Sequence, residues 1–352
     1  MRAAGPTPRT GLALDAAGVH AEGMATARQV EIRDGVELSS LDTPLFDGAD
    51  ATKRDLVDYL DAVAEPILRE LAGRPLSVVK ARPRQQPFMQ KNLPEHAPDF
   101  VRRVVVWSDA GRREIHYPVC EDRRTLLWLA NQRAVEYHPT VMLPDLDVAE
   151  GERVDVLAGR VTHLVLDIDP PEGGGFDQAV AAALLVREAL AGADLAGAVK
   201  TSGSKGVHVI VPVRDLAPPD AAAATRALAA RAERLDPDVA TTAYIKADRG
   251  GKVFLDSTRS GGASLACAYS PRARPGTPVS WPVGWDDLPD VVPADFTVRS
   301  APALLDGDPW ATMLPAPQRV PDDVVAEGHE IPVARVAAMH EGKRRKRAAE
   351  QG

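Results

Sequence analysis

The sequence predicts an α+β protein, and three features of the chain lead to that prediction. Stretches with helical periodicity alternate with short β-branched runs, and from position 161 the order is strand, helix, strand, strand, helix, strand. No run of eighteen apolar residues occurs, so we expect neither a membrane span nor a membrane partner. In a split β-α-β unit of this kind the first and third strands are central neighbours, and the fourth flanks the first. The six elements are expected at 161–169, 176–191, 198–201, 207–213, 219–235 and 252–256.

The elements before this unit follow from local signals. A helix is expected over 52–72, because Thr52 and Asp55 have the spacing of an N-cap and its reciprocal acid. Pro66 is expected to kink this helix without ending it. The predicted buried face of the helix comprises Leu56, Leu60, Val63, Ile67 and Leu71. The remaining elements are a strand at 76–80, a loop without periodicity at 82–90, strands at 101–107 and 113–117, and a helix at 124–135.

Length and composition indicate how the chain is organised. With 352 residues it can bury a sizeable core, and its two cysteines favour a reducing cytoplasm. A net charge of −8 argues against a protein that binds nucleic acid over its whole surface, although a local basic groove is compatible with it. We expect a disordered N-terminus at 1–29, an N-terminal α/β subdomain at 30–150, a catalytic core at 151–300, and a C-terminal extension with a basic tail at 301–352.

Three aspartates at strand ends are the candidate catalytic residues. Asp167 and Asp169 end an apolar strand and should project from one face roughly 7 Å apart. A divalent cation would relieve their repulsion, and pairs of oxygen-liganded cations are typical of in-line displacement at phosphorus. Asp256 ends a strand that should flank the first one, provided that the register brings it level with the pair. The alternative is that the first strand simply ends at an Asp-Pro turn.

A small-residue turn at 200–209 is a candidate anion site. Ser202 and Lys205 lie in this turn, whose backbone N–H groups, hydroxyls and ammonium form a cradle of the nest type. The turn enters a strand and not a helix, so it is not a phosphate loop of the Walker kind. His208 follows it, and this residue is either a triphosphate contact or a hydrogen-bonded structural histidine.

Further basic residues could contact phosphate. Arg272 and Arg274 are spaced to share a side, as arginine pairs that clamp phosphate do, although solvated surface arginines are the alternative. His138 is ambiguous in the same way. The loop after residue 80 mixes bases with large apolar side chains, which suits a phosphate backbone with a base stacked on Phe88, unless Phe88 is buried in the core. The candidate DNA contacts of this loop are Arg82, Arg84, Phe88 and Lys91.

Taken in their order, these motifs resemble the polymerase domain of bacterial ligase D, a branch of the archaeo-eukaryotic primase-polymerase superfamily. The resemblance covers roughly residues 30–288 and implies a primase-polymerase fold whose β-α-β-β-α-β core is similar to an RRM. The segments that resemble the family are Asp55-Leu-Val-Asp-Tyr-Leu, Leu71-Ala-Gly-Arg-Pro, Phe88-Met-Gln-Lys91, Trp128-Leu-Ala-Asn-Gln, His138-Pro, Asp167-Ile-Asp-Pro, Lys200-Thr-Ser-Gly-Ser-Lys-Gly-Val-His208, Lys252-Val-Phe-Leu-Asp256 and Ala268-Tyr-Ser-Pro-Arg272.

The resemblance implies a role for each candidate. Asp167, Asp169 and Asp256 would bind two Mn²⁺ or Mg²⁺ ions, and Phe88 would stack on the template. The nucleotide contacts would be Ser202, Lys205, His208, His138, Arg272 and Arg274. Three positions depart from the family pattern: Met89 stands where a second aromatic residue is common, Thr43 where a lysine that helps to hold a downstream 5′-phosphate is expected, and Arg259 where glutamine is frequent. Lys53 is retained as a DNA contact.

The function implied is a template-dependent nucleotidyltransferase that extends primers and fills gaps at DNA ends, in non-homologous end joining or related repair. Its partners would be gapped or tailed DNA, ribo- or deoxynucleoside triphosphates, a separate DNA ligase and an end-binding protein, in the bacterial cytoplasm at the nucleoid. No Lys-x-Asp-Gly ligase signature occurs, so we expect a stand-alone polymerase module. The alternatives are a primase that needs no primer, a nuclease with the same carboxylates, and a non-catalytic module that bridges DNA ends.

Overall fold

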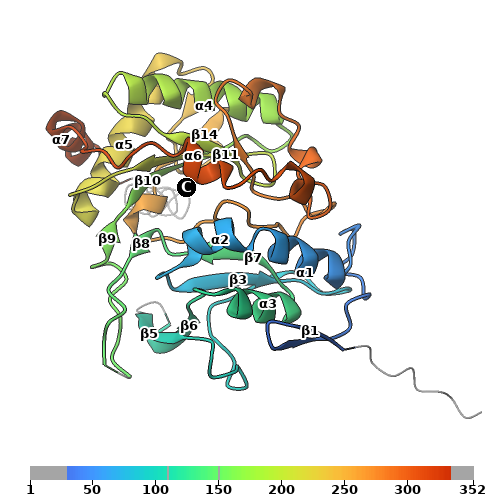
Figure 1. Ribbon diagram of the computed structural model, residues 1–352. Coiled ribbons are helices and arrows are strands. Elements are labelled where there is room, and N and C mark those ends of the chain that lie inside the picture. The colour runs from blue at the N-terminus through green and yellow to red at the C-terminus, as the bar shows by residue number, and fades with distance from the viewer. Residues whose placement is uncertain (1–29, 109–110, 150, 334–352) are drawn as a thin grey trace, which may run out of the picture.

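The computed structural model describes residues 30–108, 111–149 and 151–333. It is a mixture of helices and sheets, which confirms the predicted α+β class. In Figure 1 the sheet with β10, β11 and β14 occupies the upper part of the molecule, and the sheet with β3 and β7 lies below it. The predicted disordered segment 1–29, the basic tail at the end of the chain and the boundary residue 150 lie outside the described residues. None of the helices within the described ranges is long and apolar enough to cross a membrane.

The upper sheet has six strands in the order β13-β14-β10-β12-β11-β15. Its central strands β10 and β12 are antiparallel neighbours and β14 flanks β10, as the split β-α-β pattern predicts. Helices α4 and α5 pack on each other and on β10 and β12, so the opposite face of the sheet is turned toward the lower part (Figure 1). The elements are β10 (His163–Asp169), α4 (Phe176–Ala191), β11 (Ala198–Thr201), β12 (Val207–Pro212), α5 (Pro218–Leu235), β13 (Ala240–Thr241), β14 (Val253–Asp256) and β15 (Pro282–Val283).

The lower part contains a three-stranded sheet, two hairpins and three helices. Its sheet has the order β4-β3-β7, and α3 packs against α1, α2 and β7. All five residues of the predicted buried helix face are fully buried, which confirms that face. The elements are β1 (Glu31–Arg33), β2 (Val36–Leu38), α1 (Lys53–Ala62), α2 (Ala64–Leu71), β3 (Leu76–Lys80), β4 (Phe88–Gln90), β5 (Arg103–Ser108), β6 (Arg113–Pro118), α3 (Arg123–Asn131) and β7 (Ala134–Pro139).

Three predictions about these elements were wrong. The helix expected over 52–72 is interrupted at Val63, because the ring of Pro66 is incompatible with the carbonyl four residues earlier, at Ala62, where α1 ends. Helix α3 stops before 135, since Arg133 has a left-handed backbone conformation and the chain then enters β7. The end of the loop at 82–90 forms the edge strand β4, which is paired with β3.

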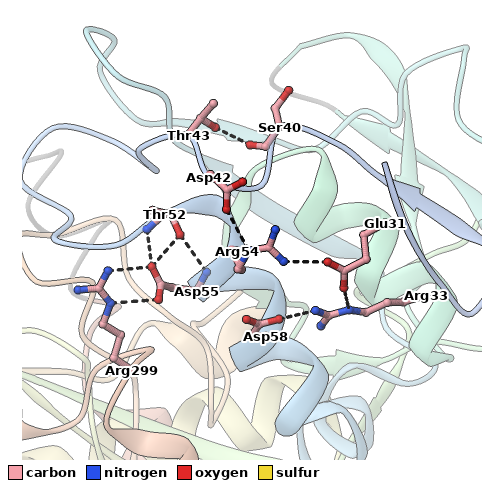
Figure 2. Close-up of polar contacts among 10 residues, drawn as sticks. All are labelled: Glu31, Arg33, Ser40, Asp42, Thr43, Thr52, Arg54, Asp55, Asp58 and Arg299. Carbon is pink, nitrogen blue, oxygen red and sulfur yellow. Dashed lines mark hydrogen bonds and ion pairs between the residues drawn. The ribbon is translucent and has the colours of Figure 1, made fainter. Parts of the chain in front are cut away.

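Polar contacts at the start of α1 connect distant segments (Figure 2). Thr52 and Asp55 form the predicted capping box. Asp55 also accepts two hydrogen bonds from Arg299, of 3.1 and 2.9 Å, which attach the chain after the upper sheet to the lower part. On the other side of the helix, Arg54 bridges Asp42 and Glu31. The N-terminal hairpin and the C-terminal part of the chain are thus both anchored to α1.

The two parts share one continuous hydrophobic core. Buried Tyr59 of α1 donates a 2.7 Å hydrogen bond to the carbonyl of Tyr269, in the segment that returns from the upper sheet. The remaining elements are β8 (Met142–Leu143) and β9 (Arg160–Val161), which pair with each other between the parts, the short helix α6 (Pro309–Met313), and α7 (Asp322–Glu330), which packs on α5. A functional site between the two sheets therefore has a well-packed frame.

Candidate functional site

A row of polar side chains crosses four strands of the upper sheet. Asp167 of β10 is the register partner of Asp256 in β14 on one side and of His208 in β12 on the other. His208 is in turn the partner of Lys200 in β11. Because directly paired residues project from the same face of a sheet, the four side chains form one row. The register thus brings Asp256 level with Asp167, a point that the sequence alone left open.

The carboxylates of this row influence each other's charge. Asp169 lies two residues beyond Asp167, at the end of β10. Burial and the negative charges of Asp167 and Asp256 raise the pKa of Asp169. Burial would also raise the pKa of Asp167, but His208 and Arg259 outweigh burial and hold this pKa below its usual range. The site therefore concentrates negative charge that a cation would relieve.

Arg259 supplies positive charge to two of the carboxylates. Its Nε and one terminal nitrogen lie 3.1 and 3.0 Å from Asp167 Oδ2, and Nε lies 3.5 Å from Asp256 Oδ2. Three carboxylates at adjacent strand ends are the oxygen donors that Mg²⁺ and Mn²⁺ prefer, so the donor set fits such cations. Across the described ranges, no group of three or more His, Cys, Asp or Glu side chains is placed so that it could hold a metal ion. The types of oxygen donor that such a cation prefers are present, but they are not gathered into a coordination site.

The predicted anion turn lies next to this row. The N–H of Ser202 donates to Gly206 O at 2.9 Å, and the Ser202 hydroxyl accepts from Gly206 N–H at 3.1 Å. Gly203 has φ +69°, and a Cβ there would lie 2.5 Å from Arg272 Cγ and 3.0 Å from Ser280 N, so only glycine fits. The hydroxyl of Ser202 is thus part of the turn itself. Lys205 is exposed, and its ammonium donates to the carbonyl of Pro171.

A buried glutamate joins two of the predicted phosphate contacts. Glu136 Oε2 lies 2.8 Å from His138 Nε2 and 3.1 Å from Arg272 Nε, and Oε1 accepts from Ala273 N–H at 2.9 Å. Burial would raise the pKa of Glu136, but His138 and Arg272 outweigh burial and lower it to about 2. Arg272 also donates to the carbonyl of Ser202. This cluster therefore connects the lower sheet to the anion turn.

Several of the predicted site residues line one of two cavities. One, of about 410 Å³, lies over the polar row, and its lining includes Met89, Lys91, His138, Asp167, His208, Arg259 and Arg272. The other, of about 360 Å³, is lined by the anion turn, including Lys205, and by Arg274. Arg272 lines the first cavity and Arg274 the second, in a segment where Arg274 N–H donates to Arg272 O at 2.9 Å.

The predicted DNA contacts fall into two groups. Arg82, Arg84 and Lys91 are exposed, and so is Phe88, 47% of whose surface is accessible; the alternative of a core phenylalanine was therefore wrong. Met89 and Lys91 are two residues apart and line the larger cavity together. Edge strand β4 thus presents an apolar and basic surface beside the polar row.

Lys53 belongs to the second group, because it is only 4% exposed. Its ammonium donates to Ser39 O at 2.6 Å, and burial, together with the nearby charge of Arg133, lowers its pKa to about 8. Arg133 donates to the hydroxyl of Thr43 and to two backbone carbonyls. Figure 2 shows Thr43 and Ser40 of this loop near the start of α1. The positive charges of Lys53 and Arg133 therefore lie near each other, and the hydrogen bonds described here join both side chains to neutral oxygens.

Three residues of these clusters were missed by the sequence analysis as site residues. Glu136 stands two residues before His138 in a strand, and this spacing was a usable signal. Lys200 and Arg133 gave no such signal, because their neighbours come from other strands and loops.

Comparisons with known proteins show which sequences and folds this chain resembles. A sequence model of the family described as LigD, primase-polymerase domain, matches residues 52–310. The chain is 34% identical over 261 residues to the multifunctional non-homologous end joining DNA repair protein LigD of Mycobacterium tuberculosis, which is 72% of this chain and 34% of that protein. It is 30% identical over 269 residues to the bifunctional LigD of Bacillus subtilis, covering 75% of this chain and 41% of that protein. The chain thus spans well under half the length of these relatives.

A solved structure resembles most of this fold. It is the polymerase domain from Mycobacterium tuberculosis ligase D in complex with DNA, with a TM-score of 0.71 and 30% sequence identity. The match covers 79% of this chain and 97% of that chain.

Proposed function

This chain belongs to the LigD primase-polymerase domain family, and from that premise we propose that it is a template-dependent nucleotidyltransferase that extends primers and fills gaps at DNA ends in non-homologous end joining. The observation that supports this most is the register that sets Asp256 opposite Asp167, beside a cavity with basic walls. Carboxylates and cations in one cavity suit a nucleoside triphosphate together with its metal ions.

The three aspartates are proposed to hold two divalent cations, Mn²⁺ or Mg²⁺. Bound there, the cations would neutralise charge during in-line displacement at the α-phosphorus. Asp167 and Asp256 face each other across the strands, and Asp169 ends the strand beside them. Arg259 neutralises part of the charge of Asp167 and Asp256, which weakens the repulsion between these two carboxylates.

The incoming nucleotide is proposed to lie along the anion turn. Ser202 shapes this turn, and Lys205 projects from it into the smaller cavity with Arg274. On the side of the larger cavity, the nucleotide contacts would be His138 and Arg272. His208 also lines this cavity, but its two ring nitrogens face protein groups, Lys200 and Asp167. Arg272 is held by Glu136 and by the carbonyl of Ser202, so its charge is oriented before a triphosphate arrives.

DNA is proposed to bind across β4 and the loop before it. Arg82, Arg84 and Lys91 would contact phosphates, and exposed Phe88 would stack on a template base. Lys53 and Arg133 would hold the 5′-phosphate on the far side of a gap. Thr43 replaces a lysine of the family pattern, so one positive charge is lost at this loop. Arg133, which lies near Lys53 and donates to Thr43, would supply a positive charge in its place.

The proposed function is tested by primer extension on short gapped and tailed duplexes, with Mn²⁺ or Mg²⁺ and with ribo- or deoxynucleotides. We expect templated addition by the wild type and none by Asp167→Ala plus Asp169→Ala. The matched control is Asp145→Ala plus Asp147→Ala, which removes a second Asp-x-Asp pair from an exposed segment and should leave extension intact. Reactions without a primer separate a primase from a polymerase.

A non-catalytic module that bridges DNA ends is the second candidate, because the basic loop and Phe88 are exposed independently of the aspartates. It predicts no extension with either metal and DNA binding that survives loss of all three aspartates. The proposed partners in the cell are a DNA ligase and an end-binding protein, and the proposed location is the cytoplasm at the nucleoid. Co-purification with a ligase and an end-binding protein on broken DNA would test them.

A further inference from the structure

Lys200 is a buried lysine that the proposed reaction does not explain. It belongs to β11 and is only 1% exposed. Its ammonium contacts three atoms: Ser280 Oγ at 2.5 Å, His208 Nδ1 at 2.7 Å and the carbonyl oxygen of Ala266 at 2.9 Å. Burying a lysine among neutral partners is costly, so a specific arrangement of hydrogen bonds must compensate.

The three contacts of Lys200 are consistent with one pattern of donors and acceptors. The Ala266 carbonyl can only accept, and the Ser280 hydroxyl donates its proton to Thr201 O at 2.7 Å, which leaves its lone pairs for Lys200. An ammonium has three N–H donors and no acceptor. The third N–H therefore points at His208 Nδ1, and this ring nitrogen must present a lone pair.

This pattern of donors determines which ring nitrogen of His208 carries the proton. In a neutral ring, a lone pair on Nδ1 means that Nε2 carries the proton. Nε2 lies 3.3 Å from Asp167 Oδ1, so this carboxylate is the acceptor within reach of the N–H. The second oxygen of Asp167 is already engaged by Arg259. Lys200, His208 and Asp167 are consecutive members of the cross-strand row, and their order follows from the register.

We propose that Lys200 is a positioning residue of this site: it holds the His208 ring in the tautomer and orientation in which Nε2–H donates to Asp167. A fixed ring keeps the carboxylate of Asp167 in one orientation, as hydrogen-bonded groups behind metal ligands do in other proteins. The consequence for catalysis rests on the function proposed above. The hydrogen bond between Lys200 and His208 does not depend on that function and can be tested in the chain without metal, nucleotide or DNA.

The hydrogen bond is tested by two-bond ¹H–¹⁵N correlation spectra of the full chain with ¹⁵N-labelled histidine, without metal or nucleotide. His208→Asn identifies the His208 signals among those of the eight histidines. Burial lowers the pKa of Lys200 to about 7, so spectra are recorded at about pH 6 to retain its ammonium. We expect Nδ1 without a proton, shifted upfield by its donor, and Nε2 with a proton. A proton on Nδ1 in the wild type overturns the proposal, regardless of the spectra or the kcat of the variants.

The role of Lys200 is tested with Lys200→Met, which keeps the length of the side chain and removes its donors. The Nδ1 resonance should move downfield to the position of a ring nitrogen without a donor. The kcat of primer extension should fall about 10- to 100-fold, the range found for partners of metal ligands, with nucleotide KM within about twofold. The control is Val199→Ala, which removes buried volume from the same strand on its other face and should change neither.

The outcomes separate this inference from the function on which it rests. An Nδ1 resonance that does not move in Lys200→Met, or an unchanged kcat beside a moved resonance, overturns the positioning role. A wild-type chain that extends no primer overturns the proposed function, and the spectra alone then decide whether Lys200 sets the state of His208.

Discussion

Glu136→Gln is the substitution that best tests the connection between the lower sheet and the anion turn. The carboxylate of Glu136 is buried and accepts from the backbone of Ala273, while its second oxygen faces both His138 and Arg272. Glutamine preserves the shape of the side chain, but it removes the charge that balances the largely enclosed guanidinium of Arg272. We expect loss of stability together with a higher nucleotide KM in primer extension.

The magnitude follows from the pKa of Glu136. The folded protein lowers this pKa from 4.5 to about 2, because His138 and Arg272 outweigh the effect of burial. At 1.36 kcal/mol per pH unit this corresponds to about 3 kcal/mol of stability. Since the pKa is lower in the folded state, the contribution is complete well above pH 4.5 and is lost as the pH falls toward 2.

The assay is urea unfolding of the wild type and of Glu136→Gln at pH 7 and at about pH 3. The difference in free energy of unfolding should be about 3 kcal/mol at neutral pH and less than half of that at about pH 3. Glu65→Gln is the control, because Glu65 is exposed on the surface of α2 and its removal should change stability by less than about 0.5 kcal/mol. Equal stabilities at pH 7, or a difference that does not depend on pH, would refute this reasoning.

Three further predictions concern the surface, the turn and the gap. Phe88→Ala should leave unfolding unchanged, because the ring is half exposed, but weaken template binding by about 1–3 kcal/mol in fluorescence anisotropy; unchanged affinity would count against stacking. Gly203→Ala should abolish nucleotide binding in calorimetry, whereas Gly307→Ala, also at positive φ but in open space, should not; equal effects would show that backbone strain alone is responsible. Lys53→Met should remove any preference for a 5′-phosphorylated over a 5′-hydroxyl gap in extension assays, and a preserved preference would assign phosphate binding elsewhere.

Much of the upper sheet was predictable because its elements are long and strongly patterned. The helix at 176–191 and the strand at 198–201 have the bounds that the sequence predicted, and the neighbours of the first strand were predicted correctly. The strands that were missed, β13 and β15, have two residues each, too few for any periodicity. Two of the three errors in the lower part arose where a single residue, Pro66 or Arg133, overrode a pattern that otherwise continued. The third concerns β4, whose three residues are too few for periodicity.

The sequence by itself determined the α+β class, the order of the six core elements and the presence of two carboxylates on one face of a strand, because these depend on local spacing. The tertiary structure decided what stands beside those carboxylates. The strand register sets Asp256 and His208 next to Asp167 and Lys200 behind His208, and packing between the two sheets buries Glu136 with Arg272. Register and burial arise from contacts between residues far apart in the chain, and no local pattern records them.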